Sequence, residues 1–394
     1  MGVCGTKVAR GEVGDRLCAV QAFSFEPPTL GPDDIAMRGA IRSFLAGRTW
    51  SAARRVNNWA QADPDFSREL GAAGFIGMTW PRTYGGQGRS AMARLIVLEE
   101  LLAAGAPVGA HWITDRQTGP LLLRYGTPAQ RERWLPGMVR GEVFACIGLS
   151  EPGAGSDLAA VRSRATKVDG GWLLSGQKLW TSNAGIAHVM VGLFRTGGGS
   201  ERQAGLSQFL VPMDTPGIRV VPIRDMTGAS DFNEVFFDEV RLGDDALLGV
   251  EGEGWGQVTA ELALERSGPE RYLSAHALLV ALARVAQGVP ALQPLLGSLA
   301  AALWTLRQLS WGCAAKLAAG QDPAVEAAVV KVLGNAFEQA LPQIVAGLPD
   351  AVLDRDAELR PLLDALLLAS PSFSLRGGTT EIMRGMIARG LGLR

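Results

Sequence analysis

The sequence predicts an α+β protein in which a helical segment, a segment of short strands and a second helical segment follow one another along 394 residues. Three observations predict this order. Apolar residues recur at helical spacing from about residue 31 to 142, alternate with polar residues from about 146 to 249, and return to helical spacing after 252. Glycine and proline clusters separate most of these runs. A hydrophobic content of 47% suffices for a large core divided among two or three structural units.

The first part is predicted to be all helical. Its amphipathic runs cover residues 33–47, 92–105 and 128–141. The first 30 residues carry charged side chains before any apolar run forms, so they lack a signal-peptide core and are expected to be a loose extension. The expected domains are an N-terminal extension (1–30), a helical domain (31–145), a β-barrel domain (146–250) and a C-terminal helical bundle (251–394).

The central part is predicted to consist of short antiparallel strands. Period-two runs cover residues 163–168, 172–181, 188–196, 206–213, 218–223 and 233–242. Asp169, Gly170 and Gly171 lie between the first two runs and predict a hairpin turn. A β-barrel inserted between helical halves is expected to hold a ligand or an interface where the three parts meet.

Composition excludes several classes of function. A net charge of −1 offers no broad basic field for nucleic acid or for an anionic membrane. No stretch reaches the roughly 18 uninterrupted apolar residues of a membrane span. The four cysteines show neither close pairing nor CxxC spacing, which argues against disulfides and zinc and fits a cytoplasmic protein. His111, His188 and His276 lie far apart in sequence, so no metal site is predicted and each histidine is expected to be structural.

One glycine-rich turn is a candidate ligand site. The segment LSEPGAGSD, residues 149–157, packs a proline and two glycines into a turn before a strand. Such a turn exposes backbone N–H groups and the hydroxyls of Ser150 and Ser156, which suits an anionic or carbonyl-rich ligand edge. A polar turn that merely leads into the strand is the alternative. The turn is not a dinucleotide-binding fingerprint, because GxGxxG and a βαβ unit are absent.

Two further motifs fit a flat, polar-edged ligand. The segment GQKLWTSN ends a predicted strand with Trp180 beside hydroxyl residues, although a core tryptophan is the alternative. Gly377–Gly378 immediately precede a helix that Thr379 or Thr380 would cap. The glycines let a ligand approach the backbone, and the helix N-terminus favours negative charge or a carbonyl oxygen. An ordinary Gly-Thr helix start is the alternative there.

One acidic residue lies on a predicted apolar helix face. In the segment ELALERSGPERY, Tyr272 falls within roughly 20° of Glu265 around a helix, which places Glu265 on the inward stripe. Pro269 cannot donate to the Glu265 carbonyl, so we expect the helix to kink there. Arg266 and Glu270, at i and i+4, are expected to form a surface ion pair.

The three motifs, in this order within an α-β-α chain, resemble the acyl-CoA dehydrogenase family from residue 31 to 394. The segment DRQTGPLLLRYGTPAQRERWLPGMVRGE is also similar to the family's helix before the barrel. The resemblance implies a helical domain, a β-barrel and a four-helix bundle, with FAD between barrel and bundle. It implies these cofactor contacts: Ile147, Leu149, Ser150, Gly155, Ser156, Trp180, Thr181, Ser182, Thr379, Thr380 and Glu381. It implies these substrate contacts: Ser156, Arg266, Gly377 and Gly378.

The resemblance also assigns the catalytic base. Many members carry this glutamate directly before the Gly-Thr of the C-terminal motif, where this sequence has Gly377. Others, the isovaleryl-CoA type among them, carry it directly before an arginine on the first bundle helix, which matches Glu265-Arg266. Glu265 would remove the thioester α-proton while the β-hydride passes to FAD, which gives the 2-enoyl-CoA. A solvated carboxylate is too weak a base for this proton, so we expect burial to raise the pKa of Glu265.

Family segments that reach FAD across a subunit contact are incomplete in this sequence. The Arg and Phe-Gly segment after the base helix is absent, and the Gln-x-x-Gly-Gly segment survives as residues 343–347, one glycine short.

The resemblance implies an acyl-CoA substrate and an electron-transfer flavoprotein as acceptor. It implies a homotetramer, or an α2β2 assembly with a second dehydrogenase-like chain. A flavin monooxygenase on the same fold and a non-catalytic subunit are the alternatives. Gly377 removes bulk beside the substrate, so branched or ring-bearing acyl groups, as in fatty acid or steroid side-chain metabolism, are plausible.

Overall fold

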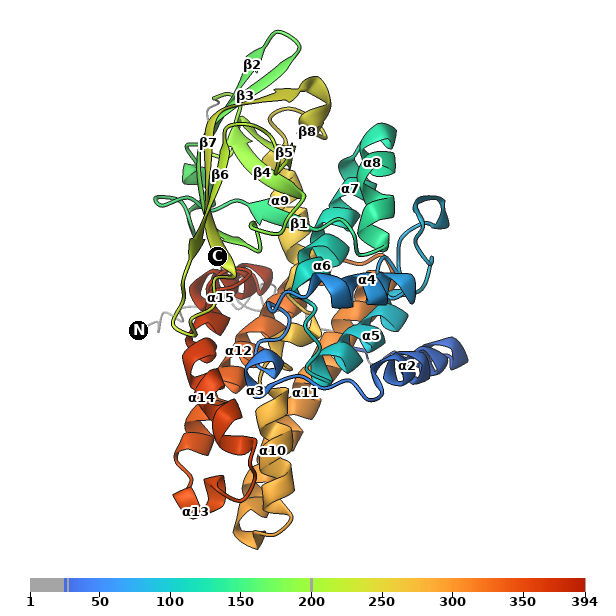
Figure 1. Ribbon diagram of the computed structural model, residues 1–394, viewed down its shortest axis with the longest axis vertical. Helices are drawn as coiled ribbons and strands as arrows, with labels where there is room; N and C mark the ends of the chain where they lie inside the picture. Colours follow the sequence, from blue (N-terminus) through green and yellow to red (C-terminus); the bar gives the residue numbers. More distant parts are fainter. Residues whose placement is uncertain (1–24, 27, 199–200, 394) are drawn as a thin grey trace, which may run out of the picture.

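The computed structural model describes residues 25–26, 28–198 and 201–393, with the backbone alone for 260–265. Figure 1 shows a sheet domain at the top, a long helical bundle below it, and the N-terminal helices packed against the side of both. The element order confirms the α, β, α arrangement. Most of the predicted N-terminal extension lies outside the described residues. At its end, Leu30 packs against a buried cluster that includes Ile96 and Trp311.

The N-terminal part begins its helices at side-chain caps. Asp63 and Ser90 each accept a hydrogen bond from the backbone of the first turn, and Thr127 forms a reciprocal capping box with Gln130. The elements are α2 (Pro32–Leu45), α3 (Ala52–Arg55), α4 (Pro64–Ala72), α5 (Ala91–Ala103), α6 (Gly109–Ile113), the π-helical turn η2 (Thr114–Thr118), α7 (Gly119–Tyr125) and α8 (Pro128–Val139). The three predicted helices match α2, α5 and α8.

The central part is one eight-stranded sheet with the order β6-β7-β3-β2-β4-β5-β8, and β1 joins β4. The strands are β1 (Ala145–Gly148), β2 (Arg164–Val168), β3 (Gly171–Ser182), β4 (Val189–Arg195), β5 (Leu206–Pro212), β6 (Ile218–Ile223), β7 (Phe232–Gly243) and β8 (Leu247–Leu248). All six predicted strands are present, and Gly170 turns the predicted hairpin with φ +72°. The purely antiparallel expectation is wrong at β4, which pairs in parallel with β1 and, at one position, with β2. Neither β1 nor β2 is joined to β4 by a hairpin, because other strands lie between them in the sequence, so their pairing need not be antiparallel.

The C-terminal part is helical, and α9 leads from the sheet domain into the bundle (Figure 1). Its elements are α9 (Gly254–Glu265), the 3-10 turn η5 (Pro269–Arg271), α10 (His276–Ala286), α11 (Gln293–Ala318), α12 (Ala324–Ala346), α13 (Asp350–Leu353), α14 (Leu359–Ala369), η7 (Ser370–Ser374) and α15 (Thr380–Gly390). Buried apolar residues of α10, α14 and α12 form most of the bundle core.

The expected kink at Pro269 is wrong, because the helix ends at Glu265, before the proline, instead of bending. Helix α9 stops at Glu265, and Gly268 is extended with φ −71° and ψ 165°. Glycine has a low helix propensity, and the proline that follows it has no N–H to donate to the preceding turn, so a helix is not favoured to continue through these two residues. Tyr272 therefore is not on the same helix as Glu265. It is buried in an apolar cluster of the N-terminal part, and its hydroxyl donates to Glu99 at 3.0 Å.

Within the described part of the chain, no helix is both long and apolar enough to cross a bilayer. Among the same residues, no group of three or more His, Cys, Asp or Glu side chains could hold a metal ion.

Cys146 and Cys313 are free and buried. His111 is buried against the Ser67 hydroxyl at 2.8 Å, and burial lowers its pKa to about 3, so it is a neutral packing residue.

Candidate active site

The first predicted motif forms a tight turn between β1 and β2. Reciprocal backbone hydrogen bonds of 2.9 and 3.0 Å between Glu151 and Ala154 close this turn. Gly155 and Ser156 follow it and are exposed, so the tip of the turn is open to a ligand. The remaining predicted contacts of this segment, Ile147, Leu149 and Ser150, are half-buried.

A buried ion pair that the sequence analysis missed fixes this turn to β3. The Nζ of Lys178 lies 2.7 Å from Oε1 of Glu151, and both side chains are inside the protein. The same carboxylate accepts backbone N–H bonds from Arg162 and Ser163 at 2.7 and 3.0 Å. Burial lowers the pKa of Lys178 to about 8, and Glu151 opposes this shift. Lys178 precedes Trp180 by two residues, so the ion pair between Lys178 and Glu151 fixes the distance between the first and second motifs.

Trp180 presents a flat apolar ring, and the next residue, Thr181, carries an unsatisfied hydroxyl. Trp180 lies at an irregularity of the β3–β7 pairing, has φ +61° and is 56% exposed, so it is not a core residue. Phe232 supports the indole edge-to-face at 6.0 Å between ring centroids. Thr181 is buried, and in the described part of the chain its Oγ1 has no hydrogen-bond partner. A buried, unsatisfied hydroxyl is costly, so this pair fits a heterocycle with a polar edge. Ser182, half-buried, ends the strand.

The third motif forms a helix start, as predicted. Gly377 and Gly378 have φ values of +67° and +98°, a region that favours glycine. Thr379 is the N-cap of α15, because its hydroxyl accepts a backbone hydrogen bond from the first turn at 3.5 Å. Thr380 and Glu381 therefore belong to the first turn of α15. Thr379 and Thr380 are half-buried and Glu381 is exposed, so this helix start can be reached by a polar ligand.

Arg266 joins the end of α9 to the glycine segment. Its side chain is buried, and its Nε lies 3.4 Å from the carbonyl oxygen of Gly377. Its Nη1 also lies 3.3 Å from Sδ of Met386 on α15. The structure thus brings two of the predicted substrate residues together. Glu265 is the last residue of α9, directly before Arg266; its side chain lies outside the described part of the chain, and its role stays a prediction.

The predicted surface pair between Arg266 and Glu270 is wrong. Both side chains are buried, and Glu270 instead pairs with Arg116 at 2.6 Å and with Arg271 at 3.4 Å. The i, i+4 geometry does not apply because the helix ends at Glu265. The 3-10 turn that follows points Glu270 toward the π-helical turn of the N-terminal part, where Arg116 lies.

Three family models match consecutive parts of the chain. They are the N-terminal domain of acyl-CoA dehydrogenase at residues 31–142, the middle domain at 146–240 and the C-terminal domain at 252–392. The chain belongs to the acyl-CoA dehydrogenase family. Members of this family are FAD-dependent oxidoreductases.

This acyl-CoA dehydrogenase has similar relatives of known sequence and structure. Acyl-CoA dehydrogenase IpdE1 of Mycobacterium tuberculosis is 37% identical over 83% of this chain and 87% of its own length. The ChsE4-ChsE5 complex from Mycobacterium tuberculosis includes a chain with a TM-score of 0.81 and 28% identity, covering 94% of this chain and 100% of that one. A structure described as the Tcur3481-Tcur3483 steroid ACAD gives a TM-score of 0.80 and 26% identity, covering 93% and 98%.

Proposed function

We propose that this dehydrogenase oxidises an acyl-CoA thioester to the 2-enoyl-CoA with Glu265 as the base. The observation that supports this proposal is the contact between Arg266 and the Gly377 carbonyl. Gly377 occupies the position where many members carry their base, and a glycine cannot accept a proton. We infer that Glu265, which directly precedes Arg266 at the end of α9, supplies the acid instead.

FAD would be held by the groups that the three motifs present. Trp180 and the unsatisfied Thr181 hydroxyl suit the ring system, the Ser150–Ser156 turn suits its polar edge, and the Thr379–Glu381 backbone suits a further polar contact. FAD, when bound, supplies the two-electron oxidation by accepting the β-hydride. The contribution of the chain is to orient the ligand and to move one proton.

The proposed proton transfer runs from the α-carbon of the thioester to the Glu265 carboxylate. Gly377 and Gly378 carry no side chain, so the thioester can approach the backbone of this segment closely. Arg266 holds the Gly377 carbonyl and therefore fixes the segment relative to the helix that carries the base. Electrons would leave to an electron-transfer flavoprotein.

The test of this proposal is an anaerobic titration of the purified protein. A yellow protein whose flavin absorbance bleaches with an acyl-CoA is expected. The panel should include straight, branched and steroid-like acyl groups, because Gly377 leaves room beside the substrate and a similar structure is described as a steroid ACAD. Bleaching by NADPH alone would favour a monooxygenase instead. A colourless protein that gains flavin with a second chain would favour a non-catalytic subunit.

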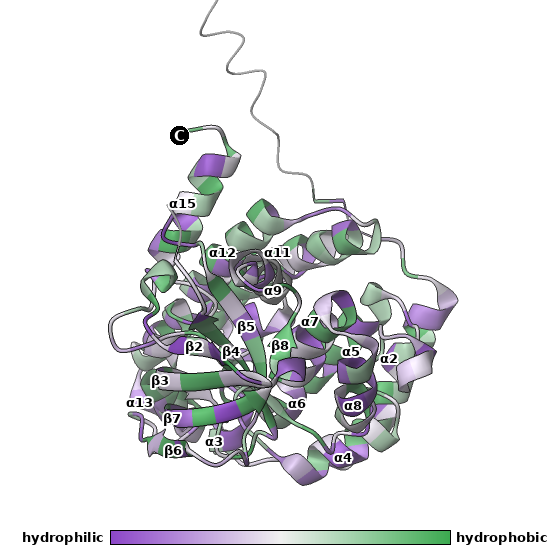
Figure 2. Cartoon of the chain, turned by 90° about the horizontal axis from the view of Figure 1, so that it is seen from above, coloured by the Kyte–Doolittle hydropathy of each residue, from purple (hydrophilic) through white to green (hydrophobic). Residues whose placement is uncertain are grey.

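We also propose that a second dehydrogenase-like chain covers the outer face of α12. Leu333 and Ile344 are 47% and 36% exposed there, and Ala336 and Ala340 between them are exposed as well. The shortened segment 343–347 ends the same helix. Figure 2 shows α15 projecting from the body of the molecule with apolar and polar residues interspersed. The heteromeric ChsE4-ChsE5 complex supports an α2β2 assembly over a homotetramer.

Replacing Trp180 with alanine is expected to weaken FAD binding about three- to tenfold, because an aromatic contact contributes about 1 kcal/mol. Flavin fluorescence during titration of the apoprotein measures the change. Trp134→Ala, on α8, is the matched control, because Trp134 is half-buried away from the three motifs and stacks on Arg133. Equal losses in both variants would contradict the assignment of Trp180.

A further inference from the structure

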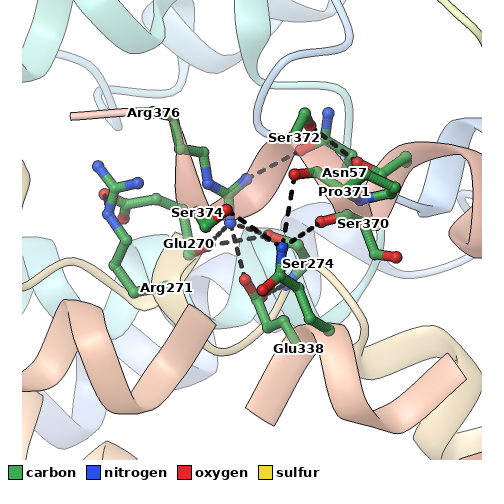
Figure 3. Close-up of polar contacts among 12 residues, drawn as sticks. Asn57, Glu270, Arg271, Ser274, Glu338, Ser370, Pro371, Ser372, Ser374 and Arg376 are labelled. Carbon is green, nitrogen blue, oxygen red and sulfur yellow. Dashed lines mark hydrogen bonds and ion pairs between the residues drawn. The ribbon is translucent and has the colours of Figure 1, made fainter. Parts of the chain in front are cut away.

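Arg376 directly precedes the glycine segment, and its side chain, 10% exposed, lies among groups from distant parts of the chain (Figure 3). Its Nη2 lies 2.7 Å from Oε2 of Glu338 on α12 and 2.9 Å from the carbonyl oxygen of Glu270 in η5. Its Nη1 donates to Oδ1 of Asn57 at 3.0 Å. One side chain thus contacts the bundle, the turn after α9 and the N-terminal part.

The carboxylate that faces Arg376 is itself held rigidly. Glu338 is fully buried, and its Oε1 accepts the backbone N–H of Ser274 at 2.7 Å. The Ser274 hydroxyl donates to the Glu270 carbonyl at 2.9 Å and lies 3.1 Å from Nη2 of Arg376 (Figure 3). Burial raises the pKa of Glu338 to about 7, and Arg376 opposes this shift. At pH 8 most of the Glu338 carboxyl is therefore ionised and faces the Arg376 cation as its counter-charge.

Two aromatic rings fix the plane of the guanidinium. The Cζ of Arg376 lies 4.3 Å from the ring centroid of Phe373 and 4.7 Å from that of Trp59. A planar cation that stacks and also donates in several directions cannot be replaced by a lysine, which has one ammonium group on a flexible stem. The site therefore specifies arginine by shape as well as by charge.

The neighbouring glycines depend on contacts of this kind. Both have positive φ, and neither lies in a helix or strand. Lys331, fully buried on α12, donates from Nζ to the Gly378 carbonyl at 2.6 Å, and Arg266 holds the Gly377 carbonyl. Two cations from other elements, Lys331 and Arg266, and the segment's own Arg376 thus restrain residues 376–378.

We propose that Arg376 is a positioning residue, which through Glu338 and the η5 turn holds Gly377–Gly378 in register with the Arg266 end of α9. This inference rests on the proposed function, because it concerns the distance between the thioester segment and the base. A misplacement of about 1 Å in such a site costs about 100-fold in rate, whereas the fold tolerates it.

The test compares Arg376→Met with a control at a similar pair elsewhere. Arg307→Met removes a guanidinium that pairs with the buried Glu99 at 2.9 Å and stacks on Trp311 at 4.1 Å, away from the glycine segment. At pH 8 we expect Arg376→Met to lower kcat about 100-fold with a smaller change in KM and with FAD retained. Arg307→Met should keep kcat within about threefold while losing stability.

Hydrogen exchange provides a readout that needs no turnover. Exchange of the backbone amides of residues 374–380 should rise about tenfold in Arg376→Met and stay at the wild-type rate in Arg307→Met. The kcat of Arg376→Lys should exceed that of Arg376→Met by less than about tenfold, because lysine lacks the planar guanidinium group with its several donors. If Arg376→Met does not fold, Glu338→Gln, which keeps an acceptor but removes the charge, should show the same exchange change at smaller amplitude.

Two outcomes would overturn the inference: wild-type kcat in Arg376→Met, or unchanged exchange of residues 374–380 in every variant at this pair. Failure of the proposed function looks different. The wild-type flavin would then not bleach with any acyl-CoA, while the exchange experiment would still report whether Arg376 holds the segment.

Discussion

Glu265→Gln is expected to leave FAD bound while acyl-CoA-driven bleaching falls by several orders of magnitude. Glutamine has the same shape but cannot accept the α-proton, and Gly377 offers no second acid in its place. The loss should exceed the factor of about 10²–10⁴ that ordinary acid-base assistance contributes. Stopped-flow absorbance of the flavin after anaerobic mixing with excess acyl-CoA measures the rate of the chemical step directly.

The matched control for this substitution is Glu253→Gln at the start of α9. Glu253 is exposed and belongs to the same helix, so its substitution makes the same chemical change away from the proposed site. We expect this variant to bleach at the wild-type rate. Near-normal bleaching of Glu265→Gln would rule out Glu265 as the base and would direct attention to a different proton acceptor.

Glu270→Gln is expected to destabilise the protein by about 3–5 kcal/mol, because it removes one partner from a buried ion pair. The carboxylate lies 2.6 Å from Arg116, and the exposed fractions of the two side chains are 1% and 5%. Arg271, 3.4 Å from the same carboxylate, is equally buried. Substitution leaves both guanidinium groups away from water without this counter-charge. Chemical denaturation followed by circular dichroism measures the loss.

A surface pair provides the control for Glu270→Gln. Glu69 pairs with Arg48 at 2.6 Å, but 53% of the glutamate side chain is exposed. Glu69→Gln should therefore cost no more than about 1 kcal/mol. Comparable losses in the two variants would show that burial does not determine the contribution of Glu270. The flavin content of Glu270→Gln also reports whether the turn after α9 stays in place.

Secondary structure was predictable because it depends on local spacing. The strand runs 206–213 and 218–223 match β5 and β6 to within one residue, since short runs of strand-forming residues bounded by glycine and proline are a local feature of the sequence. The end of α9 was predicted less well. The wheel argument assumed a continuous helix through Pro269, and that assumption placed Glu270 on the surface. Lys178 was missed for a different reason. It is an even number of residues from Trp172 and Leu174, so strand alternation does predict that its side chain points inward, but a lysine at such a position was not expected to be buried.

By itself the sequence determined the order of the three domains, the strands, and the glycine and threonine residues that form the turns and caps of the site. Those features depend on residues a few positions apart, whose spacing is visible along the chain. Only the tertiary structure decided that Arg376 bonds Asn57 across 319 positions, that Glu270 pairs with Arg116, and that Arg266 reaches Gly377. Buried charges are tolerated only with partners, and long-range packing, rather than local spacing, selects those partners.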